Sequence, residues 1–283
     1  MKKMLNKLYE IKQIINEAEA ILITAGAGMG VDSGLPDFRG NEGFWNAYPI
    51  AKKLNLGFQE MANPIWFTTN PPMAWAFYGN RYNLYKNTIP HDGFKMLLDL
   101  VKEKNDNYFI FTSNVDGQFQ KAGFDENKIV ECHGRISHFQ CSNDCRKEIW
   151  EANEEFDIDM EKFESITIPL CPKCGDIARP NILMFGDWKW NAKITLNQET
   201  RYVKWKRENK PKKLLVIELG AGTAIPTVRR ESENIAKYYN GNLIRINPRE
   251  FDVDSDYGFS IPFGALEGLK VILKNKKLHN LFN

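Results

Sequence analysis

The sequence predicts an α/β fold: a Rossmann-like parallel sheet with helices on both faces, plus a small inserted zinc-binding and helical module. Short apolar runs have the pattern of strands buried on both faces of a parallel sheet; they lie at 20–24, 108–112, 214–219 and 243–246. Stretches with helical periodicity separate these runs, as crossover connections require. Two longer segments break the alternation, and one of them carries four paired cysteines.

The helices follow from the spacing of apolar residues. Apolar side chains recur at three- and four-residue intervals in the first eighteen residues, which predicts an amphipathic helix that leads into the first strand. The stretches 93–104 and 225–239 are expected to be crossover helices between strands. A further short strand is expected at 129–132.

The segments 41–89 and 138–182 are expected to form the small module beside the sheet. The first is rich in Trp, Phe, Tyr, Asn and Pro, and the second combines the paired cysteines with an acidic patch. The Rossmann-like domain is then assembled from 1–40, 90–137 and 183–283. A chain of 283 residues is long enough for one large domain or two unequal ones.

Charge and hydropathy exclude several classes of function. Lys and Arg total 38 against 36 Asp and Glu, and a net charge of +2 is too small to indicate nucleic acid as the main partner. No stretch approaches the roughly 20 apolar residues of a membrane helix. Lys7, Glu10 and Lys12 interrupt the region where a signal peptide needs an apolar core. We therefore expect a cytoplasmic protein with no membrane partner.

Four of the five cysteines have the spacing of a structural zinc site. Cys141-x₃-Cys145 and Cys171-x₂-Cys174 are separated by 25 residues. Four thiolates complete a tetrahedral shell and leave no position open for catalysis. The fifth, Cys132, is expected to be a small buried core thiol, because neighbours on an extended segment such as Cys132 and His133 project to opposite faces.

A glycine cluster, GAGMG at 26–30, follows the first predicted strand. Such a turn lets free N–H groups approach a pyrophosphate, although Val31 replaces the third glycine of G-x-G-x-x-G. A tight turn without a ligand is the alternative. The polar loop at 33–40 adds an aromatic ring and an Arg, which could cover a ring and bind an anion.

The whole string GAGMGVDSGLPDFRG closely resembles the nucleotide-binding signature of the sirtuins, the NAD-dependent protein-lysine deacylases. Four further motifs follow in the family's order, over about residues 18–275. They are 112–116 with Ala122-Gly123, the His133-Gly134 pair, Met184–Asp187, and the late pairs Gly222-Thr223 and Ile246-Asn247. The resemblance implies NAD as co-substrate, structural zinc, and an acylated protein or peptide as partner.

The resemblance also implies roles for individual residues. His133 corresponds to the family's general base, which deprotonates a ribose hydroxyl, and a pKa near 6.5 suits this work. The other catalytic residue is Asn114, at the ribose. A structural histidine at a strand end is the alternative for His133. The implied cofactor-binding residues are Gly26, Ala27, Gly28, Asp37, Phe38, Arg39, Ser113, Asn114, Val115, Asp116, Gly222, Thr223 and Asn247.

The implied substrate-binding residues are Met184, Phe185 and Gly186, together with Tyr78 and Arg81. Tyr78-x-x-Arg81 is similar to the pair with which one sirtuin class recognises acidic acyl groups such as succinyl. At positions i and i+3 of a helix the two side chains share a face and could clamp a carboxylate. A core Tyr beside a surface Arg is the alternative.

The expected activity is NAD-dependent deacylation of protein lysines, as a deacetylase or a desuccinylase, with release of nicotinamide and O-acyl-ADP-ribose. Some segments depart from the usual pattern: Ser113 replaces a Gln, and Pro226 and Arg229 stand in unusual places. NVDGQFQKAGF, QCSNDC and ELGAG also look like the macrodomain-linked sirtuins that transfer ADP-ribose to proteins. A mono-ADP-ribosyltransferase or NAD hydrolase therefore remains an alternative, as does a non-catalytic NAD or ADP-ribose sensor.

Overall fold

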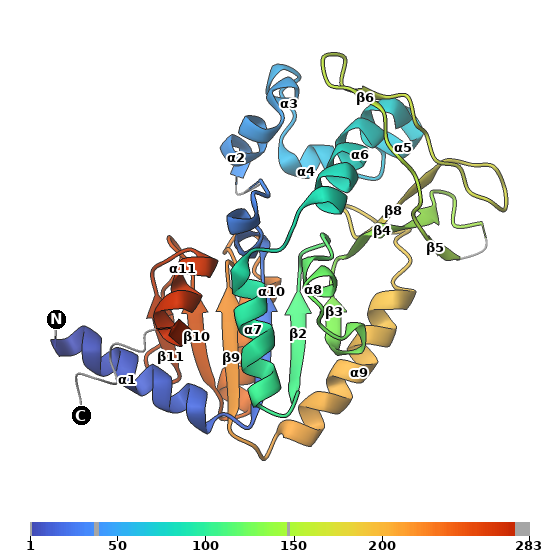
Figure 1. The fold of residues 1–283 in the computed structure, drawn as a ribbon. Helices are drawn as coiled ribbons and strands as arrows, with labels where there is room; N and C mark the ends of the chain where they lie inside the picture. The colour runs from blue at the N-terminus through green and yellow to red at the C-terminus, as the bar shows by residue number, and fades with distance from the viewer. Residues whose placement is uncertain (1, 37–39, 146–147, 275–283) are drawn as a thin grey trace.

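The computed structural model describes residues 2–36, 40–145 and 148–274. Its centre is a six-stranded sheet in the order β11-β10-β9-β1-β2-β3, in which every neighbouring pair is parallel (Figure 1). The strands are β1 (Ala20–Ala25), β2 (Tyr108–Thr112), β3 (Ile129–Glu131), β9 (Leu214–Leu219), β10 (Asn242–Ile246) and β11 (Gly258–Ile261). The predicted fold class is confirmed.

Helices cover both faces of this sheet because consecutive strand residues point to opposite sides. Ile21 and Ile23 of β1 belong to a core formed with α1 (Lys2–Glu17), α7 (Asp92–Glu103) and α11 (Ala265–Leu269). Ala20 and Leu22 belong to a second core on the other face. That core is formed with α9 (Lys193–Asn209) and α10 (Thr227–Tyr238).

The small module lies beyond the carboxyl ends of the strands, on the side to which the arrows of Figure 1 point. Its helices are α2 (Gly40–Ala47), α3 (Pro49–Lys53), α4 (Phe58–Met61), α5 (Trp66–Thr69) and α6 (Pro71–Asn87). Its strands are β4 (Gly134–Cys141), β5 (Ile149–Glu151), β6 (Ile158–Asp159), β7 (Glu164–Ser165) and β8 (Ala178–Ile182). Strands β5, β4 and β8 form one antiparallel sheet, and β6 pairs with β7.

Both inserted segments contribute to one aromatic core in this module. Trp75 of α6 stacks on Phe156 from the second segment, with ring centroids 4.9 Å apart and planes 15° apart. Trp75 also donates a hydrogen bond from Nε1 to the carbonyl oxygen of Ala178 at 3.1 Å. The two segments therefore bury their apolar residues against each other, and the exact bounds of the module stay a prediction.

Helix α6 is fastened to the sheet domain at its C-terminal end. Lys121 of α8 (Gln118–Lys121) donates from Nζ to the carbonyl oxygens of Tyr85, Lys86 at 2.8 Å and Thr88 at 3.3 Å. A cation is favoured at this end, where helix carbonyls lack intrahelical partners.

The predicted elements shift by only one or two residues. Strand β1 extends to Ala25, β3 ends at Glu131, and α10 begins at Thr227. Strand β11 and helix α9 were not predicted. Short turns complete the description: 3-10 turns at Ala27–Met29, Val31–Ser33 and Glu126–Lys128, and a π-helical turn at Lys270–Lys274. None of the helices in the described part of the chain is sufficiently long and apolar to cross a bilayer.

Candidate active site

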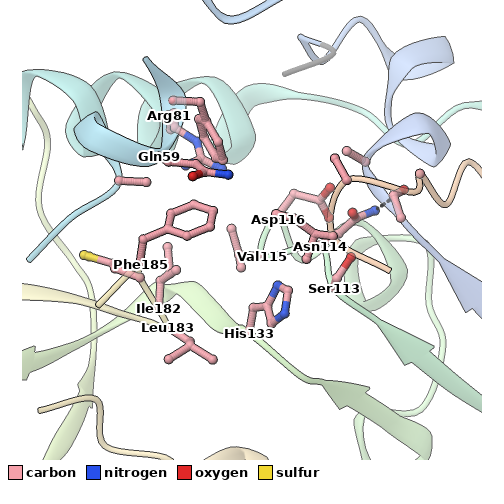
Figure 2. A pocket seen from close by; sticks show the side chains of 18 of the residues that line it. Gln59, Arg81, Ser113, Asn114, Val115, Asp116, His133, Ile182, Leu183 and Phe185 are labelled. Carbon is pink, nitrogen blue, oxygen red and sulfur yellow. Dashed lines mark hydrogen bonds between the residues drawn. The ribbon is translucent and has the colours of Figure 1, made fainter. Parts of the chain in front are cut away.

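A cavity of about 750 Å³ lies between the carboxyl edge of the sheet and the small module (Figure 2). This volume falls in the range of ordinary small-molecule sites. The sheet side contributes Gly26, Ala27, Ser113, Asn114, Val115, Asp116, His133, Gly220, Ala221 and Gly222. The module side contributes Gly57, Phe58, Gln59, Glu60, Tyr78, Arg81 and Tyr85, and the segment after β8 adds Met184 and Phe185.

The loops after β1 and β9 meet backbone to backbone at the floor of the cavity. The amide of Gly28 donates to the carbonyl oxygen of Gly220 at 3.1 Å. A Cβ on Gly26 would stand 2.8 Å from Cα of Ala221, and one on Gly220, whose φ is +61°, would stand 2.4 Å from Gly28. The predicted glycine cluster therefore keeps side chains out of the contact between the two loops, and Gly26 and Ala27 line the cavity there.

Asn114 is fixed by the end of β2 and by the glycine loop. The hydroxyl of Thr112 donates to the carbonyl oxygen of Ala25 at 2.9 Å and accepts from the amide of Asn114 at 3.0 Å. The side chain of Asn114 in turn donates from Nδ2 to the carbonyl oxygen of Gly26 at 3.0 Å. The parallel register of β1 and β2 thus brings two predicted site motifs together.

Asp116 is a half-buried acid in the cavity wall. Burial raises its pKa to about 6, while a hydrogen bond from the amide of Gln118 at 2.9 Å and the nearby charges of Arg81 and Lys121 oppose the shift. Its neighbour Val115 is buried. Both of these implied cofactor-binding residues therefore lie in the cavity wall.

His133 projects into the cavity directly after β3 (Figure 2). The backbone is fixed there, because the amide of Leu183 donates to its carbonyl oxygen at 2.9 Å. Burial lowers the pKa of the imidazole from its usual 6.5. The ring is therefore neutral at pH 7 and able to accept a proton.

Tyr78 and Arg81 lie on one face of α6 and line the module side of the cavity. Arg81 is not a surface residue: only 7% of its surface is exposed. Its Nε and Nη2 donate to the hydroxyl of Tyr85 at 3.1 and 2.9 Å. Burial raises the pKa of Tyr78, so its phenol stays protonated. A buried cation and two phenols therefore form this wall.

Met184 and Phe185 line the cavity, and Figure 2 shows the Phe185 ring between Arg81 and His133, whereas Gly186 is not among the lining residues. The amide of Phe185 donates to the carbonyl oxygen of Ala62 at 2.9 Å. Behind the segment, Asp187 forms a buried ion pair with Arg179 and accepts from the amide of Met184 at 3.3 Å.

The late motifs lie at the other end of the cavity. Gly222 lines it, and Thr223 hydrogen-bonds the Glu250 carboxylate. Asn247 is fully buried, and its Nδ2 donates to the carbonyl oxygen of Ala221 at 2.8 Å. The structure thus places Asn247 behind the wall, supporting it. Asp37, Phe38 and Arg39 lie outside the described residues.

Sequence reasoning missed the segment Gly57–Glu60 and Tyr85 as parts of this wall. Tyr85 could have been found, because it follows Arg81 by four residues on the same helix face. Gly57–Glu60 carries no pattern that distinguishes it from a loop.

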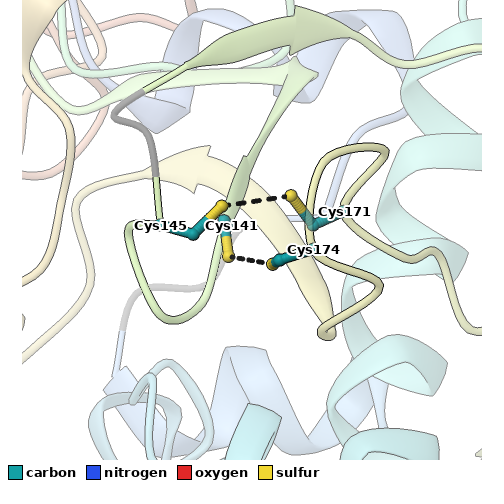
Figure 3. Close-up of side chains that lie close together, drawn as sticks. All are labelled: Cys141, Cys145, Cys171 and Cys174. Carbon is teal, nitrogen blue, oxygen red and sulfur yellow. Dashed lines mark hydrogen bonds between the residues drawn. The ribbon is translucent and has the colours of Figure 1, made fainter.

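The predicted cysteine cluster is present (Figure 3). Sγ of Cys141 lies 3.7 Å from that of Cys174, and Sγ of Cys145 lies 3.6 Å from that of Cys171. Tetrahedral Zn–S bonds of about 2.3 Å would place thiolates about 3.8 Å apart, so the four ligands fit a structural zinc ion. Cys132 packs beside the second sheet core, and burial raises its pKa to about 12.

Comparison with known proteins finds a matching family model and similar proteins. The model of the Sir2 family matches residues 26–204. The NAD-dependent protein deacylase of Aquifex aeolicus is 28% identical over 252 residues, 89% of this chain and 93% of that protein. That of Leptospira interrogans serovar Lai is 30% identical over 241 residues, 84% of this chain and 85% of the relative.

Solved structures share the fold. A Sir2 homologue in complex with NAD superposes with a TM-score of 0.71 at 23% identity, covering 97% of this chain and 95% of that chain. A Sir2 enzyme with a deacetylated peptide and 3′-O-acetyl ADP ribose superposes with a TM-score of 0.68 at 21% identity, covering 95% and 98%.

Proposed function

Because this chain belongs to the Sir2 family, we propose that it is an NAD-dependent protein-lysine deacylase that releases nicotinamide and O-acyl-ADP-ribose. The observation that carries the proposal is one cavity with the half-buried His133 on the sheet side and the buried Arg81 on the module side. An acyl-lysine from the module side and a dinucleotide on the sheet side could come into contact in this cavity.

The strand order favours NAD in this cavity. Dinucleotides bind at the carboxyl edge of such sheets where the strand order reverses, which here is between β1 and β9. The loop at Gly26–Gly28 would hold the pyrophosphate, Asn114 a ribose, and Val115 and Asp116 the carboxamide. When bound, NAD supplies the sugar carbon from which nicotinamide departs.

The chain's own residues would then orient the reactants and move a proton. His133 would accept a proton from a ribose hydroxyl, because burial keeps its imidazole neutral at pH 7. Phe185 and Val115 border the space between the two sides and would exclude water from it.

Arg81 suggests the class of acyl group. A guanidinium held in a buried wall by Tyr85, with the phenol of Tyr78 beside it, suits a carboxylate that enters the cavity. We therefore infer a preference for acidic acyl groups such as succinyl and glutaryl over acetyl.

The test is incubation of the full chain with NAD and a panel of acyl-lysine peptides, read by mass spectrometry. Loss of the acyl mass from the peptide together with O-acyl-ADP-ribose is the expected result. An ADP-ribosyl mass gain on protein would instead indicate a transferase. Tight ADP-ribose binding without nicotinamide release would indicate a sensor, and either outcome contradicts the proposal.

A further inference from the structure

Arg229 lies in the first turn of α10, behind the part of the cavity wall formed by residues 220–225. Only 9% of its surface is exposed. Nη1 donates to the carbonyl oxygens of Glu250 at 2.7 Å and Ala221 at 3.4 Å, and Nη2 donates to that of Asp252 at 3.2 Å. One buried guanidinium therefore ties the loop after β9 to the loop after β10.

Glu250 continues this connection to the cavity. Its carboxylate accepts a hydrogen bond from the amide of Thr223 at 3.2 Å and another from the Thr223 hydroxyl. A carboxylate oxygen also lies 3.2 Å from where a Cβ of Gly222 would stand. Because Arg229 fixes the backbone of Glu250, it also fixes the wall residues that contact the Glu250 side chain.

This end of the cavity lies on the far side of the strand-order reversal from His133. The sheet runs β3-β2-β1 on one side of that point and β9-β10-β11 on the other. If the reacting half of a dinucleotide lies at His133, after β3, its other nucleotide lies over the ends of β9 and β10.

We propose that Arg229 is a positioning residue that sets the affinity for the distal nucleotide of NAD by holding these two loops, without contacting substrate. The inference rests on the proposed function, since it needs NAD in this cavity. Arg suits the task because its planar fork can serve several carbonyl acceptors at once, whereas an ammonium is a point donor.

Arg229→Met tests this, with Arg230→Met as the matched control, because Arg230 is exposed and adjacent. ADP-ribose affinity of the full-length protein is measured by calorimetry. We expect at least a tenfold loss for Arg229→Met and less than a twofold change for Arg230→Met. In turnover assays KM for NAD should rise at least tenfold, while KM for the acyl peptide and kcat at saturating NAD should stay within threefold.

Unchanged ADP-ribose affinity in Arg229→Met would overturn the inference. Equal losses in the two variants would also overturn it, since they would indicate long-range attraction of the phosphates. So would equal rises in both KM values, which a general loss of structure predicts. If Arg229→Met fails to fold, Arg229→Lys replaces it, and wild-type affinity in that variant refutes the inference. If the wild type itself does not bind ADP-ribose, the proposed function fails first.

Discussion

Arg81→Met deletes the charge of the proposed acyl clamp and keeps most of the bulk. Because Arg81 is only 7% exposed, the values for buried pairs apply to it, rather than the 0–1 kcal/mol of surface pairs. Removing one partner of a buried, hydrogen-bonded charge pair costs about 2–5 kcal/mol. We take the lower end, because the hydroxyl of Tyr85 remains. The expected loss in kcat/KM for succinyl-lysine is then about 30-fold.

The assay compares kcat/KM for succinyl, glutaryl and acetyl peptides of one sequence at saturating NAD. Acetyl hydrolysis should stay within about threefold of wild type, because acetyl carries no carboxylate to lose. Lys86→Met is the matched control: it removes an exposed cation from the same helix and should leave both substrates unchanged. Equal losses on succinyl and acetyl peptides would show that Arg81 supports the helix. A wild type without preference for acidic acyl groups would refute the clamp.

Three further outcomes are expected. His133→Ala should abolish deacylation and leave ADP-ribose binding by calorimetry within a few-fold, and full retained activity would remove its catalytic role. Because burial lowers the His133 pKa, the neutral base persists below pH 6.5 and is lost only as pH falls further. The acid limb of the pH profile of kcat/KM should therefore lie below pH 6.5, and the Asp116→Asn variant should retain it. An acid limb above pH 6.5 would be inconsistent with a desolvated base. Elemental analysis should find one zinc per chain, and Cys174→Ser should lower both zinc content and Tm, because metal binding contributes folding energy; soluble protein without zinc would contradict this.

The central strands could be predicted because burial on both faces favours nearly continuous apolar runs, as in AILITA and LLVIEL, which Thr24 and Glu218 alone interrupt. Strand β11 could not be predicted because it is a short edge strand, GFSI, that is only partly buried. Helix α9 could not be predicted from apolar periodicity because it buries polar residues such as Thr195 and Gln198 while Leu196 is exposed. In these elements tertiary contacts, rather than local pattern, determine the structure.

The residues of the candidate site likewise include some that the sequence could predict and some that it could not. Motif spacing predicted which residues line the sheet side, because β1 and β2 end at one edge. Spacing could not show that Asn247 and Arg229 lie behind the wall, since their roles depend on the backbone carbonyls of distant loops. The buried position of Arg81 likewise depends on the aromatic core that the two inserted segments share.

The attachment of α6 by Lys121 determines how any rotation of the module would be distributed along that helix. With a rise of about 1.5 Å per residue, Arg81 lies about 6 Å from the fastened turn at Tyr85, whereas Pro71 lies about 21 Å away. A rotation about that pivot would displace Arg81 by less than a third of the displacement at Pro71. In any such rotation, the turn that carries Arg81 would keep its position relative to the sheet better than the N-terminal end of the helix would.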